Sequence, residues 1–209
     1  MSPASSLAAR LREATWAAHE QAADDGFLAG LLRGTRDTRD YARLASQHLV
    51  AYRALEAAIA SCDRGLVAAL HDPALERLAA VETDLAALGG AQAPTDASLA
   101  YAEHLASLAD DPVRLAAHHY TRYLGDLSGG QHIGRVLSRR FGADTTAFYR
   151  FDIDDLDAFK DGYRATISGF ELEAADESAL LAETASAYAS AEAMHASLVD
   201  GEPGSRVAA

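Results

Sequence analysis

The chain has few cysteines, few prolines and no long apolar run. Cys62 is the one cysteine among 209 residues, which excludes an intramolecular disulfide and any cysteine-based zinc or iron–sulfur site. Five prolines leave most of the chain free to form helices. No stretch resembles a secretory signal or a membrane span. These absences favour a reducing compartment, and we expect a cytoplasmic location with no membrane partner.

Positive charge is also scarce. The chain has 18 Lys and Arg residues against 31 Asp and Glu residues, which gives a formal net charge of −13. Nucleic acids and anionic membrane surfaces need a concentrated basic face, so we expect neither as a partner. An anionic ligand must instead meet a local basic cluster, and Lys160 is the only lysine that could join one.

What the chain does contain favours helices. Hydrophobic residues make up 49% of it, and many of them are alanine and leucine, which are strong helix formers. The length suits one compact domain with a core large enough to enclose a ligand. We therefore predict an all-α, single-domain fold over residues 1–200, followed by a disordered tail over residues 201–209.

Apolar residues at three- and four-residue spacing predict amphipathic helices along most of the chain. The first runs from Leu7 to Ala22. Thr38 is expected to cap a later helix, and Asp72-Pro73 indicates the start of another. Gly34 and the pair Gly89-Gly90 are expected helix ends. Beyond the first, the predicted helices cover approximately residues 28–33, 38–61, 73–88, 96–108, 111–140, 156–170 and 176–199.

The window from Tyr120 to Gln131 is unusual because three glycines interrupt a helical pattern that continues on both sides. Each interior glycine costs about 1 kcal/mol relative to alanine. Gly125 and Gly129 share one helix face, against which a flat ligand could lie while the weakened helix bends around it. A strip for close helix packing is the alternative. Arg122 and Asp126 favour the ligand, because ordered water could link them to a bound gas molecule.

His19 lies in the apolar stripe of the first predicted helix. A lone histidine in such a place is most often a satisfied core residue. Arg12, however, stands seven residues earlier on nearly the same face, about 10 Å away along the helix axis. That spacing matches the distance from a heme iron to its carboxylate edge, so one helix could hold both a metal and a propionate.

Four segments together resemble the heme oxygenase family. The window from Tyr120 to Gln131 is similar to the family's signature, and the match extends through residues 14–22, 52–56 and 159–164. The segments stand in the family's order, at about its intervals, over nearly the whole chain. The resemblance implies a multi-helix fold in which heme lies between a proximal helix and a kinked distal helix.

The resemblance also implies roles for particular residues. His19 would be the proximal iron ligand, and Gly125 and Gly129 would lie over the distal heme face. Three side chains would anchor distal water: Tyr52, Arg122 and Asp126. Four would hold the heme propionates: Arg12, Tyr120, Lys160 and Arg164. For the last two, four residues apart, an ordinary solvated helix face is the alternative.

The implied activity is oxidative opening of heme b, which serves as both cofactor and substrate. Dioxygen and an electron-donor protein, a ferredoxin or a reductase, would be partners, and the products would be biliverdin, carbon monoxide and ferrous iron, with cleavage at the α-meso carbon. One alternative is a non-catalytic heme carrier or sensor of the same fold. A helical enzyme unrelated to heme is another, but no serine or cysteine nucleophile motif and no paired Glu-x-x-His signature supports it.

Two departures from the family pattern affect the expected site. Members commonly carry a glutamate four residues after the proximal histidine, where this chain has Ala23, so no carboxylate is expected there to accept the proton on the second ring nitrogen of His19. On the last helix, Tyr188 and Ala191 replace the family's usual Phe and Asn. Part of the distal polar network is therefore expected to be missing or replaced by water.

Overall fold

The computed structural model describes residues 6–13 and 26–200, and these residues are nearly all helical. The described part of the chain contains no strand, which confirms the predicted all-α fold. Residues 201–209, the predicted tail, lie outside the described residues, as do residues 14–25 of the predicted first helix.

Residues 7–13 form the described part of that first helix. The α-helices after it are α2 (Gly26–Arg33), α3 (Thr38–Ala60), α4 (Gly65–Leu70), α5 (Leu78–Ala87), α6 (Asp96–Ser107), α7 (Pro112–His119), α8 (Gln131–Phe141), α9 (Leu156–Gly169) and α10 (Ala174–Asp200). Short helical segments join them: η1 (Pro73–Leu75), η2 (Tyr120–Leu124), η3 (Asp126–Gly130), η4 (Ala143–Thr145) and η5 (Ala147–Tyr149).

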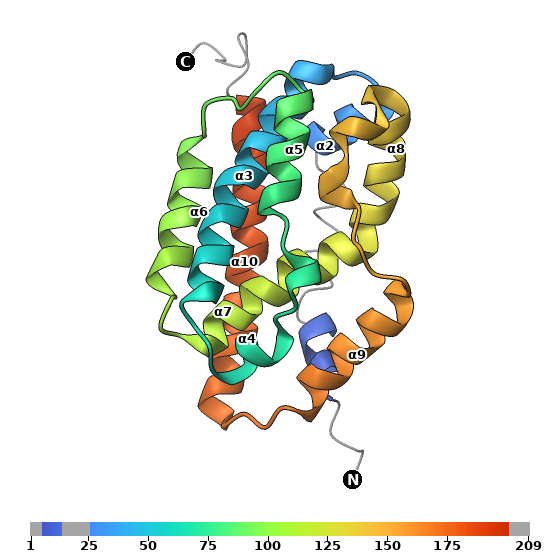
Figure 1. Cartoon of the computed structure of the whole chain (residues 1–209). Helices are drawn as coiled ribbons and strands as arrows, with labels where there is room; N and C mark the ends of the chain where they lie inside the picture. The colour runs from blue at the N-terminus through green and yellow to red at the C-terminus, as the bar shows by residue number, and fades with distance from the viewer. Residues whose placement is uncertain (1–5, 14–25, 201–209) are drawn as a thin grey trace.

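Helix α3 is the centre of the bundle. It packs against α5, α6 and α10, which run along the long axis of the molecule, while α7 packs between α4 and α10. Figure 1 shows that the path from α7 through η2 and η3 crosses the bundle diagonally and continues into α8, which turns to run along the long axis, and that α9 lies at the end where α4 is. The fully buried tyrosines Tyr52 and Tyr123 belong to α3 and to this crossing segment, so the core lies where the two meet.

Helix ends differ from prediction at α3. Its N-cap is Asp37, not Thr38, because the backbone of Asp37 is extended and its carboxylate accepts a hydrogen bond from the amide of Asp40 at 3.0 Å. Thr38 is the first residue of the helix. The predicted glycine stops are confirmed, since Gly34 and the Gly89-Gly90 pair have positive φ angles beyond α2 and α5.

The predicted helix over residues 73–88 is wrong in one respect, because the chain breaks between η1 and α5. Asp72 caps η1 through the amide of Ala74. The start of α5 is then held by a residue from another helix. Glu56 of α3 accepts hydrogen bonds from the amides of Arg77 at 2.5 Å and Leu78 at 3.0 Å. This remote cap stabilises the separate start of α5. The sequence analysis also missed α4, which is only six residues long.

The predicted helix over residues 111–140 is a continuous helical path with an irregular middle. Asp111 caps its start, and its carboxylate accepts from the amides of Val113 and Arg114. Two five-residue π-helical segments, η2 and η3, separate α7 from α8. Within the described residues, no helix is long and apolar enough to cross a membrane.

Candidate functional site

The two π-helical segments coincide with the glycine-rich window. A π turn takes in more residues than an α turn, so it widens the helix and moves its side chains out of α-helical register. Gly125 lies between the two segments, while Gly129 and Gly130 end the second. Three glycines lower the conformational energy of this departure from the α-helix, because glycine restricts the backbone least. The sequence-based expectation of a weakened helix here is therefore confirmed.

The glycines of this segment have different surroundings. A Cβ placed at Gly125 or at Gly129 would meet nothing within 4 Å, and both residues are exposed. A Cβ at Gly134, one turn into α8, would collide with Tyr149, and one at Gly130 would lie 3.4 Å from the ring of Tyr149. The first pair leaves a bare, open helix face, whereas the second pair is covered by η5.

Three predicted distal residues come together where the glycine-rich segment meets α3. Tyr52 of α3 donates a short hydrogen bond to the Asp126 carboxylate across 74 residues of sequence. The Arg122 guanidinium lies 4.9 Å from the centre of the Tyr52 ring. Arg122 is only 8% exposed, and its Nε and Nη2 atoms have no hydrogen-bond partner among the described residues. Buried donors of this kind need an acceptor, and none of the described residues supplies one.

Electrostatics sets the protonation of these groups. Burial raises the pKa of Asp126 to about 6, although the nearby Arg122 cation and the Tyr52 hydrogen bond both favour its charged form. Burial also raises the pKa of Tyr52 well above its usual range. Tyr52 is therefore a neutral hydrogen-bond donor, and Asp126 is a carboxyl group that can gain or lose a proton near neutral pH.

Aromatic packing fixes Tyr52 in place. Its ring centre lies 5.2 Å from that of Phe148 in an edge-on arrangement and 5.8 Å from that of Tyr123. Segment η5, which carries Phe148, is held by Asp84 of α5, whose carboxylate accepts from the amides of Ala147 at 2.6 Å and Phe148 at 2.9 Å. Sequence reasoning missed Phe148, Tyr123 and Asp84, because no local spacing links these distant segments.

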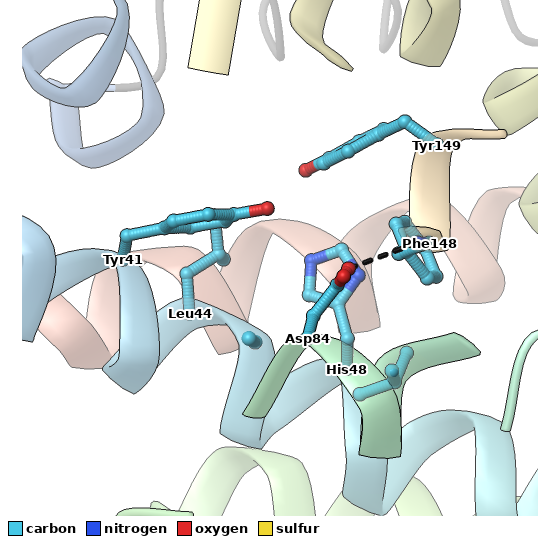
Figure 2. A pocket seen from close by; sticks show the side chains of 8 residues that line it. Tyr41, Leu44, His48, Asp84, Phe148 and Tyr149 are labelled. Carbon is cyan, nitrogen blue, oxygen red and sulfur yellow. Dashed lines mark hydrogen bonds between the residues drawn. The ribbon is translucent and has the colours of Figure 1, made fainter. Parts of the chain in front are cut away.

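A small cavity lies behind this packing. Figure 2 shows it between α3 and η5, with the Tyr41 and Tyr149 hydroxyl groups directed toward each other and His48 beside Asp84. Its free volume is about 10 Å³, which is enough for about one water molecule. Both ring nitrogens of His48 lack a hydrogen-bond partner among the described residues. The cavity is far too small for a porphyrin.

The candidate propionate residues Lys160 and Arg164 both lie on α9. Lys160 pairs with Asp157 at 2.7 Å, and Arg164 pairs with Asp161 at 3.0 Å, each three residues apart. Between them, Tyr163 is buried and its hydroxyl lies 2.8 Å from His119 Nδ1 at the end of α7. This contact fixes α9 against the segment in which Tyr120 follows His119.

The remaining predicted residues fall in three groups. His19 and Ala23 lie outside the described residues. Arg12 is exposed on the helical stretch 7–13, and Tyr120 is buried at the start of η2. On α10, Tyr188 and Ala191 are both partly buried. The described geometry thus brings Tyr52, Arg122 and Asp126 together beside the open glycine face, and it leaves the contacts of the proximal side undescribed.

Similarity to known proteins agrees with this arrangement. A family model described as heme oxygenase matches residues 5–196. Heme oxygenase 1 of Synechocystis sp. (strain ATCC 27184 / PCC 6803 / Kazusa) is 33% identical over 193 residues, which are 88% of this chain and 80% of that protein. A heme oxygenase of Guillardia theta is 33% identical over 172 residues, or 77% of this chain and 73% of that protein.

Solved structures give the same result. The structure of heme oxygenase-1 from the cyanobacterium Synechocystis sp. PCC6803 in complex with heme has a TM-score of 0.86 and 32% identity, and covers 93% of this chain and 92% of that one. Heme oxygenase from Leptospira interrogans has a TM-score of 0.85 at 28% identity, covering 91% and 98%. This chain belongs to the heme oxygenase family.

Proposed function

We propose that the protein is a biliverdin-producing heme oxygenase that binds heme b against the open face of the Gly125–Gly129 segment. The observation that carries this proposal is the juxtaposition of that bare face with the Tyr52–Asp126 pair and the unsatisfied donors of Arg122. A flat macrocycle could lie against a helix face without side chains, and hydrogen-bond donors beside that face would hold water next to it. The described residues provide both features.

When bound, heme supplies the iron chemistry that activates dioxygen and also the carbon skeleton that is opened, with electrons from a ferredoxin or a reductase. The protein then has to hold water and protons at the distal side. Arg122 would order water through its free Nε–H and Nη2–H groups. Tyr52 fixes the Asp126 carboxyl group, whose pKa of about 6 suits proton exchange with that water near neutral pH.

The proximal side completes the proposal. His19 would bind the heme iron from the segment of the first helix that lies outside the described residues, and Ala23 would leave its second ring nitrogen to a backbone carbonyl or water. Arg12, Tyr120, Lys160 and Arg164 would hold the propionates and so direct oxidation to the α-meso edge. The short ion pairs of Lys160 and Arg164 lie within α9 itself, so both cations would have to exchange an aspartate for a propionate.

A heme carrier of the same fold is the competing function, and a single assay separates the two. Hemin is added to the full-length protein, binding is followed by growth of the Soret band, and an electron source is then supplied under air. An oxygenase loses the Soret band and forms a bilin. The His19→Ala variant, treated in the same way, should lack the wild-type axial-ligand spectrum. Stable heme with no bilin under electron supply would contradict the proposal and favour the carrier.

A further inference from the structure

A second cluster of polar side chains lies where α6, α7 and α10 meet. His104 of α6, His118 of α7 and Glu183 of α10 each bring one potential ligand atom to within 4.8 Å of the others. Glu183 Oε1 is 2.6 Å from His104 Nε2 and 2.9 Å from His118 Nε2. Two imidazole nitrogens therefore converge on one carboxylate oxygen, which is an arrangement that an ordinary ion pair does not need.

Each short distance implies a proton on the nitrogen, because a bare nitrogen and a carboxylate oxygen would repel each other. Glu183 therefore accepts these protons as a carboxylate. A metal that takes His118 Nε2 would move its proton to Nδ1, which leaves a neutral imidazole and a carboxylate, the forms in which these side chains bind metals.

The neighbouring side chains also suit a metal site. The Tyr101 hydroxyl lies 3.1 Å from His118 Nδ1 and directs the opposite nitrogen, Nε2, toward Glu183. A metal-binding histidine commonly has such a partner on its second nitrogen. The His118 side chain is fully buried, but that of His104 is 37% exposed, so an ion has a route from solvent and room for a bound water.

We propose that His104, His118 and Glu183 bind a divalent transition-metal ion, Zn²⁺ or one with the same ligand preference, with water as a further ligand. Two imidazoles and one carboxylate are a ligand set that zinc accepts. Zinc ligands at tetrahedral angles stand roughly 3.3 Å apart, so each histidine nitrogen would move less than about 1 Å away from Glu183 Oε1. The two nitrogens, which lie within 4.8 Å of each other, would approach the same spacing. The His118 proton then lies on Nδ1, where the Tyr101 oxygen accepts it.

Two cations act on this cluster, the buried Arg122 near His118 and the more exposed Arg114. Arg114 Nε lies 3.6 Å from Glu183 Oε2, and its guanidinium also binds Asp111 at 2.7 Å. The positive charge opposes a second cation at Glu183. Because the Arg114 side chain is 47% exposed, it can be replaced without opening the core. The Arg114→Gln variant should therefore bind zinc more tightly, by about tenfold.

The test is a Zn²⁺ titration of the full-length protein in competition with a chromogenic chelator. Wild type should bind one zinc ion tightly. His104→Ala and Glu183→Gln should each weaken binding at least 30-fold, and both are checked for folding by circular dichroism. The control variants are His132→Ala, which removes an exposed histidine of α8, and His19→Ala, which removes a candidate heme ligand. Neither control should change the affinity.

A cluster that serves only to hold three helices together predicts a different result. His104→Ala and Glu183→Gln would then lower the Tm. Added zinc, however, would not raise the Tm of wild type, and the zinc affinities of wild type and the variants would be the same. Equal zinc affinity in wild type and His104→Ala would overturn the proposal. Loss of the tight site in a control variant would place it elsewhere and would also overturn it. Tighter binding by Arg114→Gln supports the proposal without depending on a destabilised variant.

Discussion

Two pairs of glycines on one crossing segment have opposite surroundings. Gly125 and Gly129 are exposed and have open space where a side chain would begin, whereas Gly130 and Gly134 lie beneath Tyr149. The same spacing of four residues thus serves two purposes. The second pair is a packing strip of the kind that glycine spacing alone suggests, and the first pair is not, because nothing in the described structure covers it.

The polar groups do not follow this division. Asp126 lies on the covered side, because a Cβ at Gly130 would stand 3.6 Å from the Asp126 Cβ. The Asp126 carboxylate accepts a hydrogen bond from Tyr52, and the Arg122 guanidinium lies against the same tyrosine ring, so these buried polar groups gather where the segment meets α3, at a cost in stability. Asp84 holds η5 through the amides of Ala147 and Phe148, which keeps Tyr149 over the covered glycines.

The largest effect should come from filling the open face. Gly129→Leu places a bulky side chain where heme is proposed to lie, so hemin affinity should fall by about 10- to 100-fold. Because no atom from another part of the described chain lies within 4 Å of the new Cβ, the free energy of unfolding of the heme-free protein should change by less than about 1 kcal/mol. Hemin titration and urea unfolding measure the two quantities. Unchanged hemin affinity would mean that this face does not contact heme.

A substitution on the covered face should instead lower the stability of the heme-free protein. Gly134→Ala forces a methyl group into Tyr149, and overpacking of this kind typically costs about 1–3 kcal/mol, more than alanine gains as a helix former. Urea unfolding of the heme-free variant should show this loss. A variant as stable as wild type would show that η5 moves aside freely, and the contrast between the two halves would disappear.

The effect of the buried Asp126 carboxyl group on the free energy of unfolding should depend on pH. The folded-state pKa of Asp126 is about 6, above its unfolded value of about 4, so folding favours the protonated form. Its stabilising contribution is complete below pH 4 and is lost as the pH rises through 6. Asp126→Asn should therefore be more stable than wild type by about 2–3 kcal/mol at pH 7.5, and the difference should vanish near pH 4. A difference independent of pH would contradict this assignment.

The smallest expected effect is a gain in stability on substitution of Gly129. Gly129→Ala adds a methyl group to open space and improves helix propensity, which should stabilise the heme-free protein by about 0.5–1 kcal/mol. Thermal or urea unfolding beside Gly134→Ala, the matched substitution on the covered face, gives the comparison. If both substitutions changed stability in the same direction, the two faces would not differ as described.

Local signals in the sequence predicted much of the fold. Apolar periodicity found most helices, and glycines with positive φ marked the ends of α2 and α5. The errors came from contacts between distant segments. Glu56 reaches 21 residues along the chain to begin α5, and a six-residue helix such as α4 is too short to show a period. Neither feature has a local signature.

The candidate site was predicted to a similar degree. The glycine window and its acidic and basic neighbours are visible in the sequence, and the family resemblance added Tyr52. The direct pairing of Tyr52 with Asp126 was not predicted, nor was the covering of Gly134 by Tyr149, because both depend on how α3 and η5 pack against the crossing segment. The cluster around Glu183 was missed for the same reason, since its three residues belong to three helices.

The most direct test of the central claim is bilin formation by wild type and Asp126→Ala, each loaded with equal hemin and given the same electron source. If Asp126 supplies protons at the distal side, the variant should bind hemin with nearly unchanged affinity while its rate of bilin formation falls by about 100-fold or more. A variant that forms bilin as fast as wild type would contradict the account.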